Sequence, residues 1–169
     1  MAAAPCGGGS GGGATAVLPG LLLAGFEESF DRRALAAHGV THVLNVAAEC
    51  EVSQRVGLAY QKHGLPDDDP AADIRAVLGP CMAFLRAAHD GGGCALVHCL
   101  EGVSRSACVV ACYMVAHLGW AWPRAWARLR RLRPAVDPFP LYLAQTAAWL
   151  AATAAARAGP SDLSRGPTD

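Results

Sequence analysis

The most informative segment of the chain is Val97-His98-Cys99-Leu100-Glu101-Gly102-Val103-Ser104-Arg105-Ser106. Residues 94–99 are mostly apolar and predict a buried strand, and the apolar residues from about 103 to 118 predict a helix that is buried on nearly every face. A cysteine thus lies where a strand ends and an arginine where a helix begins. Gly102, between them, permits the backbone conformation of a tight turn. The stretch therefore predicts a strand–loop–helix unit.

Such a unit is suited to hold a phosphate. The first N–H groups of a helix have no partner within the helix, and the helix dipole adds partial positive charge at the same end. The planar guanidinium of Arg105 can bind two phosphate oxygens at once. The same field favours the anionic form of a cysteine placed within it. We therefore expect Cys99 to be a thiolate nucleophile beneath a phosphate-binding loop.

The rest of the chain predicts strands that alternate with helices, which is typical of an α/β fold with a mostly parallel central sheet. Gly79-Pro80 is expected to kink or split one of the helices. We expect a Gly/Ala-rich disordered tail over 1–16, one domain over 17–157 and a second disordered tail over 158–169. The predicted strands cover 17–26, 41–47 and 58–63, and the further predicted helices cover 30–38, 71–90, 122–133 and 141–157.

Composition limits the classes of partner. Fourteen basic and fourteen acidic side chains cancel, so net charge gives no argument for binding to nucleic acid or to a membrane surface. The seven cysteines include no CxxC pair and no zinc-binding spacing. The N-terminus lacks the features of a signal peptide, and the longest apolar run, Ala107–Ala116, is too short to span a membrane. We expect a soluble protein of the cytoplasm, with the nucleus as a further location, that needs no metal or cofactor.

The motif HCLEGVSRS resembles the HCxxGxSRS signature of the protein tyrosine phosphatase superfamily, in particular that of the small dual-specificity phosphatases. The resemblance extends over about residues 17–152, through VLPGLLLAGF, GVTHVLNVA and ARLRRLRPAVDP. It implies an α/β/α sandwich and hydrolysis of phosphotyrosine and phosphoserine/threonine in proteins. It also implies a shallow pocket, because the domain has no room for the added loop with which tyrosine-only enzymes deepen theirs.

The resemblance assigns roles to the residues of the loop. Cys99 attacks phosphorus and forms a phosphocysteine intermediate, and Ser106 helps the thiolate to leave in the second step. Arg105 binds the phosphate and stabilises charge in the transition state. His98 and Ser104 support the loop. The phosphate is surrounded by Leu100, Glu101, Gly102, Val103, Ser104 and Arg105.

The mechanism further requires a proton donor for the leaving oxygen. In the family this donor is an aspartate about 30 residues before the cysteine. Asp67, Asp68 and Asp69 stand in a row at that place. The family has an Asp-Ile or similar pair about five residues after the acid, and the pair Asp73-Ile74 selects Asp68. Asp67 and Asp69 remain alternatives, and a simple solvated turn is the reading without catalysis.

Two other functions are weighed against phosphoprotein hydrolysis. A phosphatase-like scaffold that binds phosphoproteins without turnover typically lacks the cysteine, the arginine or the acid, and all three are present here. Phosphatases for phosphoinositides or RNA 5′-phosphates tend to carry basic residues within the loop, whereas this loop carries only the acidic Glu101. A phosphoprotein substrate is therefore favoured, and the oligomeric state is left open.

Three arginines recur at helical spacing, at Arg124, Arg128 and Arg131. This spacing favours a solvated amphipathic helix over a docking surface for acidic phosphoprotein segments.

A catalytic thiol with a lowered pKa is sensitive to oxidation. Cys50 and Cys94 are the candidates that could form a disulfide with Cys99.

Overall fold

The computed structural model describes residues 13–51 and 57–158, which form one five-stranded sheet flanked by helices. The order of the strands is β1-β2-β5-β3-β4. β1 pairs antiparallel with β2, and every other pair is parallel, so the predicted mostly parallel sheet is confirmed. The strands are β1 (Thr15–Leu18), β2 (Leu21–Ala24), β3 (His42–Ala47), β4 (Ala59–Leu65) and β5 (Ala95–His98).

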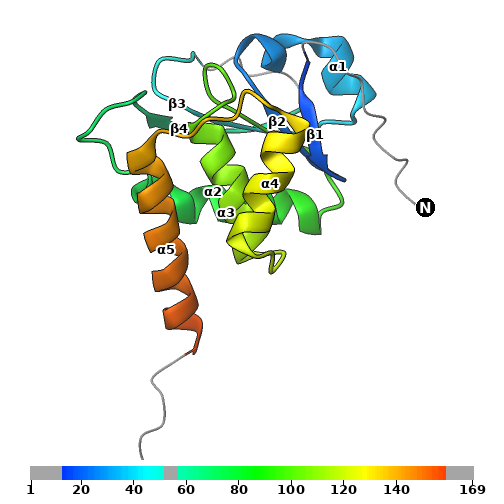
Figure 1. Ribbon diagram of the computed structural model, residues 1–169. Helices are drawn as coiled ribbons and strands as arrows, with labels where there is room; N and C mark the ends of the chain where they lie inside the picture. The colour runs from blue at the N-terminus through cyan, green and yellow to red at the C-terminus, as the bar shows by residue number, and fades with distance from the viewer. Residues whose placement is uncertain (1–12, 52–56, 159–169) are drawn as a thin grey trace, which may run out of the picture.

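Helices cover both faces of the sheet, which gives the expected α/β/α layers (Figure 1). The short helix α1 lies on one face together with the 3-10 turn η1, and the four longer helices lie on the other. The predicted tails fall mostly on 1–12 and 159–169, outside the described residues. The helical elements are η1 (Glu27–Phe30), α1 (Arg32–Ala37), α2 (Arg75–Asp90), α3 (Arg105–Ala116), α4 (Trp122–Leu132) and α5 (Pro140–Ala158).

Alternating side chains divide the core into two layers, as expected for strands buried on both faces. In β2, Leu21 and Leu23 belong to the larger apolar cluster, which also includes residues of α2, α3, α4 and α5. Leu22, between them, belongs to the smaller cluster with Leu35 of α1. All four β2 residues are buried. The continuous apolar run therefore reflects burial on both faces of the sheet.

The predicted single strand over 17–26 is wrong, because the chain reverses within it. Pro19-Gly20 forms a turn between β1 and β2, with Gly20 at φ 74°, a left-handed conformation that glycine adopts without strain. A Cβ at Gly20 would also approach the Gly93 carbonyl oxygen to 3.2 Å. β1 begins at Thr15, before the expected domain boundary at Val17.

The expectation that Gly79-Pro80 splits the predicted helix over 71–90 is also wrong. α2 runs without a break from Arg75 to Asp90 with Pro80 inside it. Proline removes one helical hydrogen bond, the one that the carbonyl of Ala76 would accept. Both Pro80 and Ala76 are exposed, so water can hydrogen-bond that carbonyl instead. The predicted helix over 30–38 begins later than expected, because the Asp31 side chain caps α1 by accepting from the backbone N–H groups of Arg33 and Ala34, each at 3.0 Å.

α3 is the central helix of the lower layer, as predicted from its apolar sequence. Residues 105–114 are all buried, and the helix contacts α2, α4 and α5 as well as the sheet. α3 therefore connects the loop at its N-terminus to the opposite edge of the domain through a packed core.

Among the described residues, no helix is both long and apolar enough to cross a membrane.

The fully buried Leu44 of β3 provides a test of this core. Leu44→Ala is expected to lower the free energy of unfolding by about 2–5 kcal/mol, because it removes apolar contacts and leaves a cavity. Leu118→Ala, at a position 37% exposed, should change it by only about 0.5 kcal/mol. Urea denaturation followed by circular dichroism measures both. Equal losses in the two variants would contradict the assignment of Leu44 to the core.

Candidate active site

The loop 99–104 lies between the carboxyl end of β5 and the N-terminus of α3, as the sequence predicted. It packs closely on the residues that follow β2, since the N–H of Phe26 donates to the Leu100 carbonyl at 2.7 Å. Gly102 has φ 72°, and a Cβ there would come within 2.5 Å of the Ala24 carbonyl. Any other residue at 102 would collide with backbone that cannot move aside. Glycine is therefore required by both conformation and space.

Cys99 lies at the base of this loop and is 2% exposed. Its sulfur accepts from the backbone N–H of Gly102 at 3.3 Å and lies 3.2 Å from the Ser106 hydroxyl oxygen. Both contacts place hydrogen-bond donors where an anionic sulfur would accept them. Burial raises the pKa of the Cys108 thiol, in the first turn of α3, to about 12.

The guanidinium of Arg105 is 1% exposed and is held by three groups. Nη1 and Nη2 donate to the two carboxylate oxygens of Glu49 at 2.8 and 2.6 Å. Nη1 also donates to the Leu65 carbonyl at 2.9 Å, and Nη2 lies 3.2 Å from a carboxylate oxygen of Asp67. Burial alone would lower the pKa of Arg105, but the hydrogen bond to Glu49 and the neighbouring negative charges raise it overall.

The buried Nε of Arg105 has no hydrogen-bond partner among the described residues. A buried donor of this kind normally has a partner, because an unpaired one loses its hydration without compensation. It belongs to the guanidinium that the sequence assigns to phosphate binding. An oxyanion bound in the loop would supply the missing acceptor.

Glu49 is the site residue that the sequence analysis missed. Its carboxylate forms a two-pronged ion pair with Arg105, and the hydrogen bond from Arg105 lowers the pKa of Glu49, so it stays ionised at neutral pH. Glu49 follows the carboxyl end of β3. In parallel α/β sheets the residues beyond these strand ends surround the ligand site, and this rule could have pointed to it.

The turn that carries Glu49 is itself fixed by two side chains. Lys62, the only lysine in the chain, donates to the carbonyls of Ala48 at 3.1 Å and Cys50 at 2.7 Å. The fully buried Asn45 donates to the Cys50 carbonyl at 3.1 Å. These bonds hold the backbone on both sides of Glu49. The ion pair with Arg105 therefore depends on residues that never approach the loop.

The three consecutive aspartates differ in their surroundings. Asp67 contacts Arg105, and its pKa is raised, chiefly by burial, although Arg105 acts in the opposite direction. Asp68 is exposed and adopts a left-handed φ of 45°. Asp69 serves the turn, since its carboxylate accepts from the N–H of Ala71 at 2.8 Å. The structure thus brings Asp67 to the loop, whereas the spacing to Asp73-Ile74 selects Asp68.

The remaining loop residues have structural contacts. The buried Ser104 accepts from the N–H of Phe139 at 2.9 Å, which ties the loop to the segment before α5. His98 is 1% exposed, its Nδ1 lies 3.1 Å from the Cys99 carbonyl oxygen, and burial lowers its pKa. Leu100 and Glu101 are exposed at the rim, and Val103 is half-buried.

The two cysteines considered as redox partners lie at opposite ends of the sheet. Cys94 precedes β5 and Cys99 follows it, so the four residues of the strand lie between them and the extended chain separates them by about 16 Å. Burial raises the pKa of Cys50, and its thiol is near enough to feel the charges of Glu49 and of Cys99. The geometry thus separates Cys94 from Cys99 and leaves Cys50 nearby. All six described cysteines are free.

In the described parts of the chain, no group of three or more histidine, cysteine or acidic residues is arranged to hold a metal ion. The groups that converge on the loop are instead a thiol, a guanidinium, two carboxylates and a hydroxyl. This set can bind an oxyanion, attack it and donate a proton.

Comparison with known proteins identifies the family. Residues 22–150 match the family described as dual specificity phosphatase, catalytic domain. The chain is 34% identical to human Dual specificity phosphatase 28 over 129 residues, which is 76% of this chain and 73% of that protein. It is 30% identical to mouse Dual specificity protein phosphatase 15 over 130 residues, 77% of this chain but only 54% of that protein.

The fold is found in solved structures of the same class. A mouse putative dual specificity phosphatase, crystallised with zinc tungstate, superposes with a TM-score of 0.81 at 28% identity, over 92% of this chain and 97% of that chain. The family match covers the loop, Glu49 and the three aspartates. The chain therefore belongs to the dual specificity phosphatases of the protein tyrosine phosphatase superfamily, as a small, atypical member of this class of enzymes.

Proposed function

We propose that this protein hydrolyses phosphotyrosine and phosphoserine/threonine in proteins through a phosphocysteine intermediate on Cys99. The observation that carries the proposal is the position of the Cys99 sulfur at the base of a loop that ends at the buried guanidinium of Arg105. The N-terminus of α3 adds backbone N–H groups and partial positive charge at the same place.

Two displacement steps follow from this arrangement. In the first, the Cys99 thiolate forms an S–P bond while the P–O bond to the substrate breaks, and an aspartic acid gives its proton to the leaving oxygen. In the second, water forms a P–O bond while the S–P bond breaks, and the aspartate takes up a proton from that water. The Ser106 hydroxyl, 3.2 Å from the sulfur, stabilises the thiolate as it leaves.

Arg105 binds and stabilises the phosphoryl group in both steps. Glu49 occupies both terminal nitrogens of the guanidinium, so the phosphate approaches the unpaired Nε and the side now in contact with Asp67. A dianionic phosphate repels the ionised Asp67 carboxylate. Substrate binding therefore favours the protonated form of Asp67 or moves it away from Arg105.

We propose Asp67 as the proton donor, with Asp68 as the alternative from sequence spacing. Asp67 is the only one of the three aspartates that contacts Arg105 in the described structure, and burial raises its pKa toward the range useful to a general acid. Asp68 would have to turn inward from an exposed, left-handed backbone position.

The loop favours phosphoproteins over other phosphate esters. Its side chains include no lysine or arginine between Cys99 and Arg105, and Glu101 is exposed at the rim. A polyanionic phosphoinositide or RNA end gains no additional cation there. The proposed substrates are phosphoproteins inside the cell, in the cytoplasm and also in the nucleus.

A weakly active scaffold is the second candidate, and one observation favours it. In this structure Arg105 already forms ion pairs with two carboxylates, and a phosphate must compete with these ion pairs before it can bind. If Asp67 stays paired with Arg105, the protein would bind phosphate esters weakly and hydrolyse them slowly. Measured turnover separates the two candidates.

Cys99→Ser is expected to reduce hydrolysis of p-nitrophenyl phosphate to background, because an alcohol is a far weaker nucleophile than a thiolate at neutral pH. Cys108→Ser, a buried thiol away from the loop, is the matched control and should retain turnover. Steady-state rates at pH 6 and denaturing mass spectrometry of rapidly quenched reactions, which detects a phosphoryl adduct on wild type, provide the measurements. Full activity in Cys99→Ser would rule out the proposed nucleophile.

Asp67→Asn is expected to lower kcat for a phosphotyrosine peptide by about 10²- to 10⁴-fold, because the leaving phenolate then receives no proton. A general acid must be protonated, so the kcat of the wild type should fall as the pH rises through the raised pKa of Asp67. This fall in kcat should be absent in Asp67→Asn. Asp68→Asn and Asp69→Asn serve as matched comparisons across pH 4.5–8. Absence of this fall in Asp68→Asn alone would identify Asp68 as the proton donor.

Glu49→Gln is expected to lower kcat/KM for p-nitrophenyl phosphate by about 10- to 100-fold, because Arg105 loses its charged partner and its fixed orientation. Lys62→Gln should act in the same direction but less strongly, since it loosens the turn that carries Glu49. Glu51→Gln, an exposed change two residues from Glu49, is the control. Unchanged inhibition by inorganic phosphate in Glu49→Gln would show that Glu49 does not position Arg105.

A further inference from the structure

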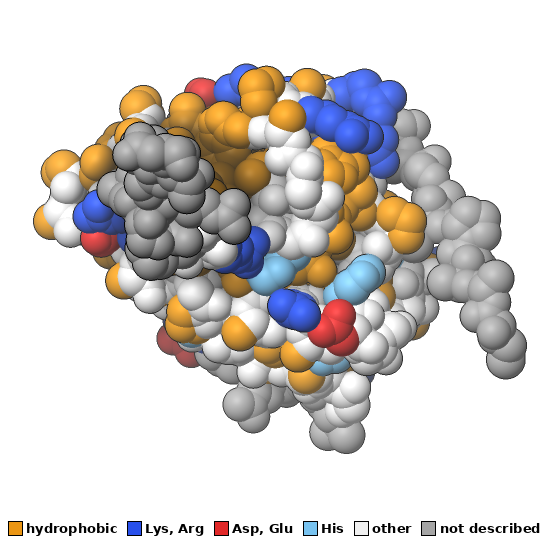
Figure 2. Space-filling model, turned by 90° about the horizontal axis from the view of Figure 1, so that it is seen from below, with side chains coloured by type: hydrophobic (Ala, Val, Ile, Leu, Met, Phe, Trp, Pro, Cys, Tyr) orange, Lys and Arg blue, Asp and Glu red, His pale blue; other side chains and the backbone are white. Residues whose placement is uncertain are grey.

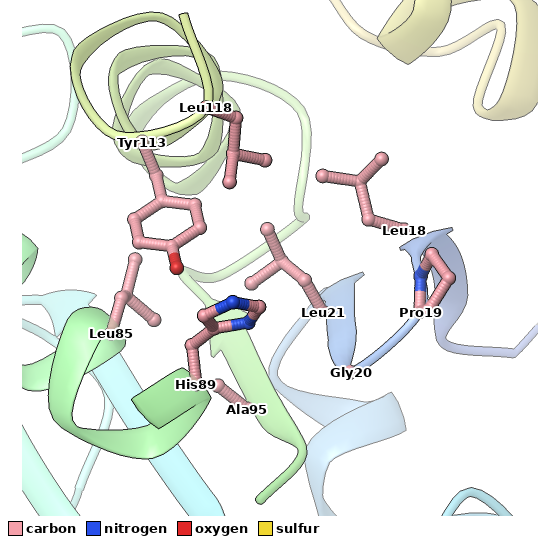
Figure 3. Close-up of a pocket in the computed structure, with 9 residues that line it drawn as sticks. All are labelled: Leu18, Pro19, Gly20, Leu21, Leu85, His89, Ala95, Tyr113 and Leu118. Carbon is pink, nitrogen blue, oxygen red and sulfur yellow. The ribbon is translucent and has the colours of Figure 1, made fainter. Parts of the chain in front are cut away.

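A second pocket lies at the edge of the sheet opposite the catalytic loop. It has a volume of about 210 Å³ and is formed by the β1–β2 turn, the start of β5 and the last turns of α2 and α3 (Figure 3). Most of its lining is aliphatic, from Leu18, Pro19, Leu21, Leu85 and Leu118. An engineered cavity of about 150 Å³ is known to hold benzene, so this volume admits a group of about one ring.

Two polar side chains, those of Tyr113 and His89, line this pocket. Tyr113 is 4% exposed, and its hydroxyl makes no hydrogen bond to any described residue. Figure 3 shows this hydroxyl directed toward the His89 ring and the middle of the pocket. The His89 side chain is exposed, so water can hydrate its ring. Since the Tyr113 ring is buried and its hydroxyl faces the cavity, a polar group of a ligand there can accept a hydrogen bond from it.

The pocket opens into a polar hollow of about 470 Å³, which shares His89, Tyr113 and Leu118 with it. Arg86, Asp90, His117 and Arg157 complete the hollow. Figure 2 shows basic, histidine and acidic side chains gathered near the middle of this face, beside hydrophobic surface. Burial lowers the pKa of His117, and the charges of Arg157 and Arg86 lower it further, while Asp90 acts in the opposite direction.

The cations of the hollow have structural roles that do not exhaust their donors. Arg86 pairs with Asp90 at 3.3 Å through Nε, and Arg157 donates to the Ala116 carbonyl at 2.8 Å through Nη1. Favourable interaction with the C-terminal ends of α2 and α3 explains why basic residues occur there. It does not explain an apolar pocket beside them with a tyrosine hydroxyl turned into it. Asp90 is the only acidic residue that lines either cavity, so the cations are in excess.

We propose that this face binds a small amphipathic carboxylate, with its apolar ring between Leu21, Leu85 and Tyr113 and its carboxylate toward Arg86 and Arg157. The Tyr113 hydroxyl donates to the carboxylate at the junction of the two cavities. α3 separates this position from the loop, since Arg105 and Tyr113 lie eight residues apart, about 12 Å along the helix. The site is therefore distinct from the catalytic one, and binding there does not depend on the proposed reaction.

Titration of the full ¹⁵N-labelled chain with 3-phenylpropanoate, followed by amide chemical shifts, tests the proposal. Saturable shifts at Gly20, Ala95 and Leu118 are expected, with a Kd of about 1 mM, as is usual for a ligand of this size. The uncharged 3-phenylpropanamide should bind about tenfold more weakly, because it offers no negative charge to the arginines. No saturable shift up to 10 mM, or equal affinity for acid and amide, would overturn the proposal.

Variants localise the binding. Tyr113→Phe should weaken 3-phenylpropanoate by about threefold to tenfold through loss of one hydrogen bond. Arg86→Gln should weaken the acid but not the amide, and Arg124→Gln, an exposed arginine on α4, is the matched control. Binding unaffected by both Tyr113→Phe and Arg86→Gln contradicts the proposed pose. Hydrolysis of p-nitrophenyl phosphate, measured on the same samples, tests the catalytic proposal separately and reports that each variant is folded.

Discussion

The guanidinium of Arg105 carries a positive charge with almost no access to water, and this sets the arrangement of the residues around it. A buried cation is tolerated only when its charge is balanced and its N–H groups are bonded. Glu49 supplies the charge and two acceptors, and the Leu65 carbonyl supplies a third. These partners follow or end two strands, β3 and β4, that pair with each other. The need to neutralise one side chain therefore joins three parts of the chain at one edge of the sheet.

The same constraint shapes the chemistry of the site. Glu49 fixes the plane of the guanidinium before any substrate is present, and preorganised charge of this kind costs nothing to reorient during the reaction. Asp67 shares the guanidinium with Glu49, so the space for phosphate and the position of the candidate acid are coupled. In the proposed reaction Asp67 yields to the phosphate and then protonates the leaving oxygen, so its environment changes during the cycle. The site is thus held firmly on the Glu49 side and remains adjustable on the Asp67 side.

α3 relates the two ends of the domain. Its N-terminus carries Arg105 and Ser106 at the carboxyl edge of the parallel strands, where ligands of open α/β sheets bind. Its last turn carries Tyr113, and Leu118 follows, both lining the pocket at the opposite edge. The helix between them is fully packed, so the two ends are joined by a rigid element. The domain thereby presents the proposed phosphate site at one edge and a mixed apolar and cationic surface at the other.

Features that depend on neighbours along the chain could be predicted from the sequence. Cys99, Gly102, Arg105 and Ser106 lie within eight residues, so strand end, loop and helix start could be predicted from local pattern and motif. The buried character of α3 followed from its apolar composition. Where local signals were ambiguous the prediction failed, as at Pro19-Gly20, where a turn interrupts what looks like one apolar strand.

Contacts between residues far apart in the sequence depend on the tertiary fold. Glu49 lies 56 positions before Arg105, and no pattern around Glu49 announces the ion pair. The spacing to Asp73-Ile74 selects Asp68 among the three aspartates, whereas the fold brings Asp67 into contact with Arg105. Tyr113 and Leu21 meet in one pocket for the same reason. Local pattern specifies which elements form, whereas side-chain partnerships across the sheet depend on packing that brings separated segments together.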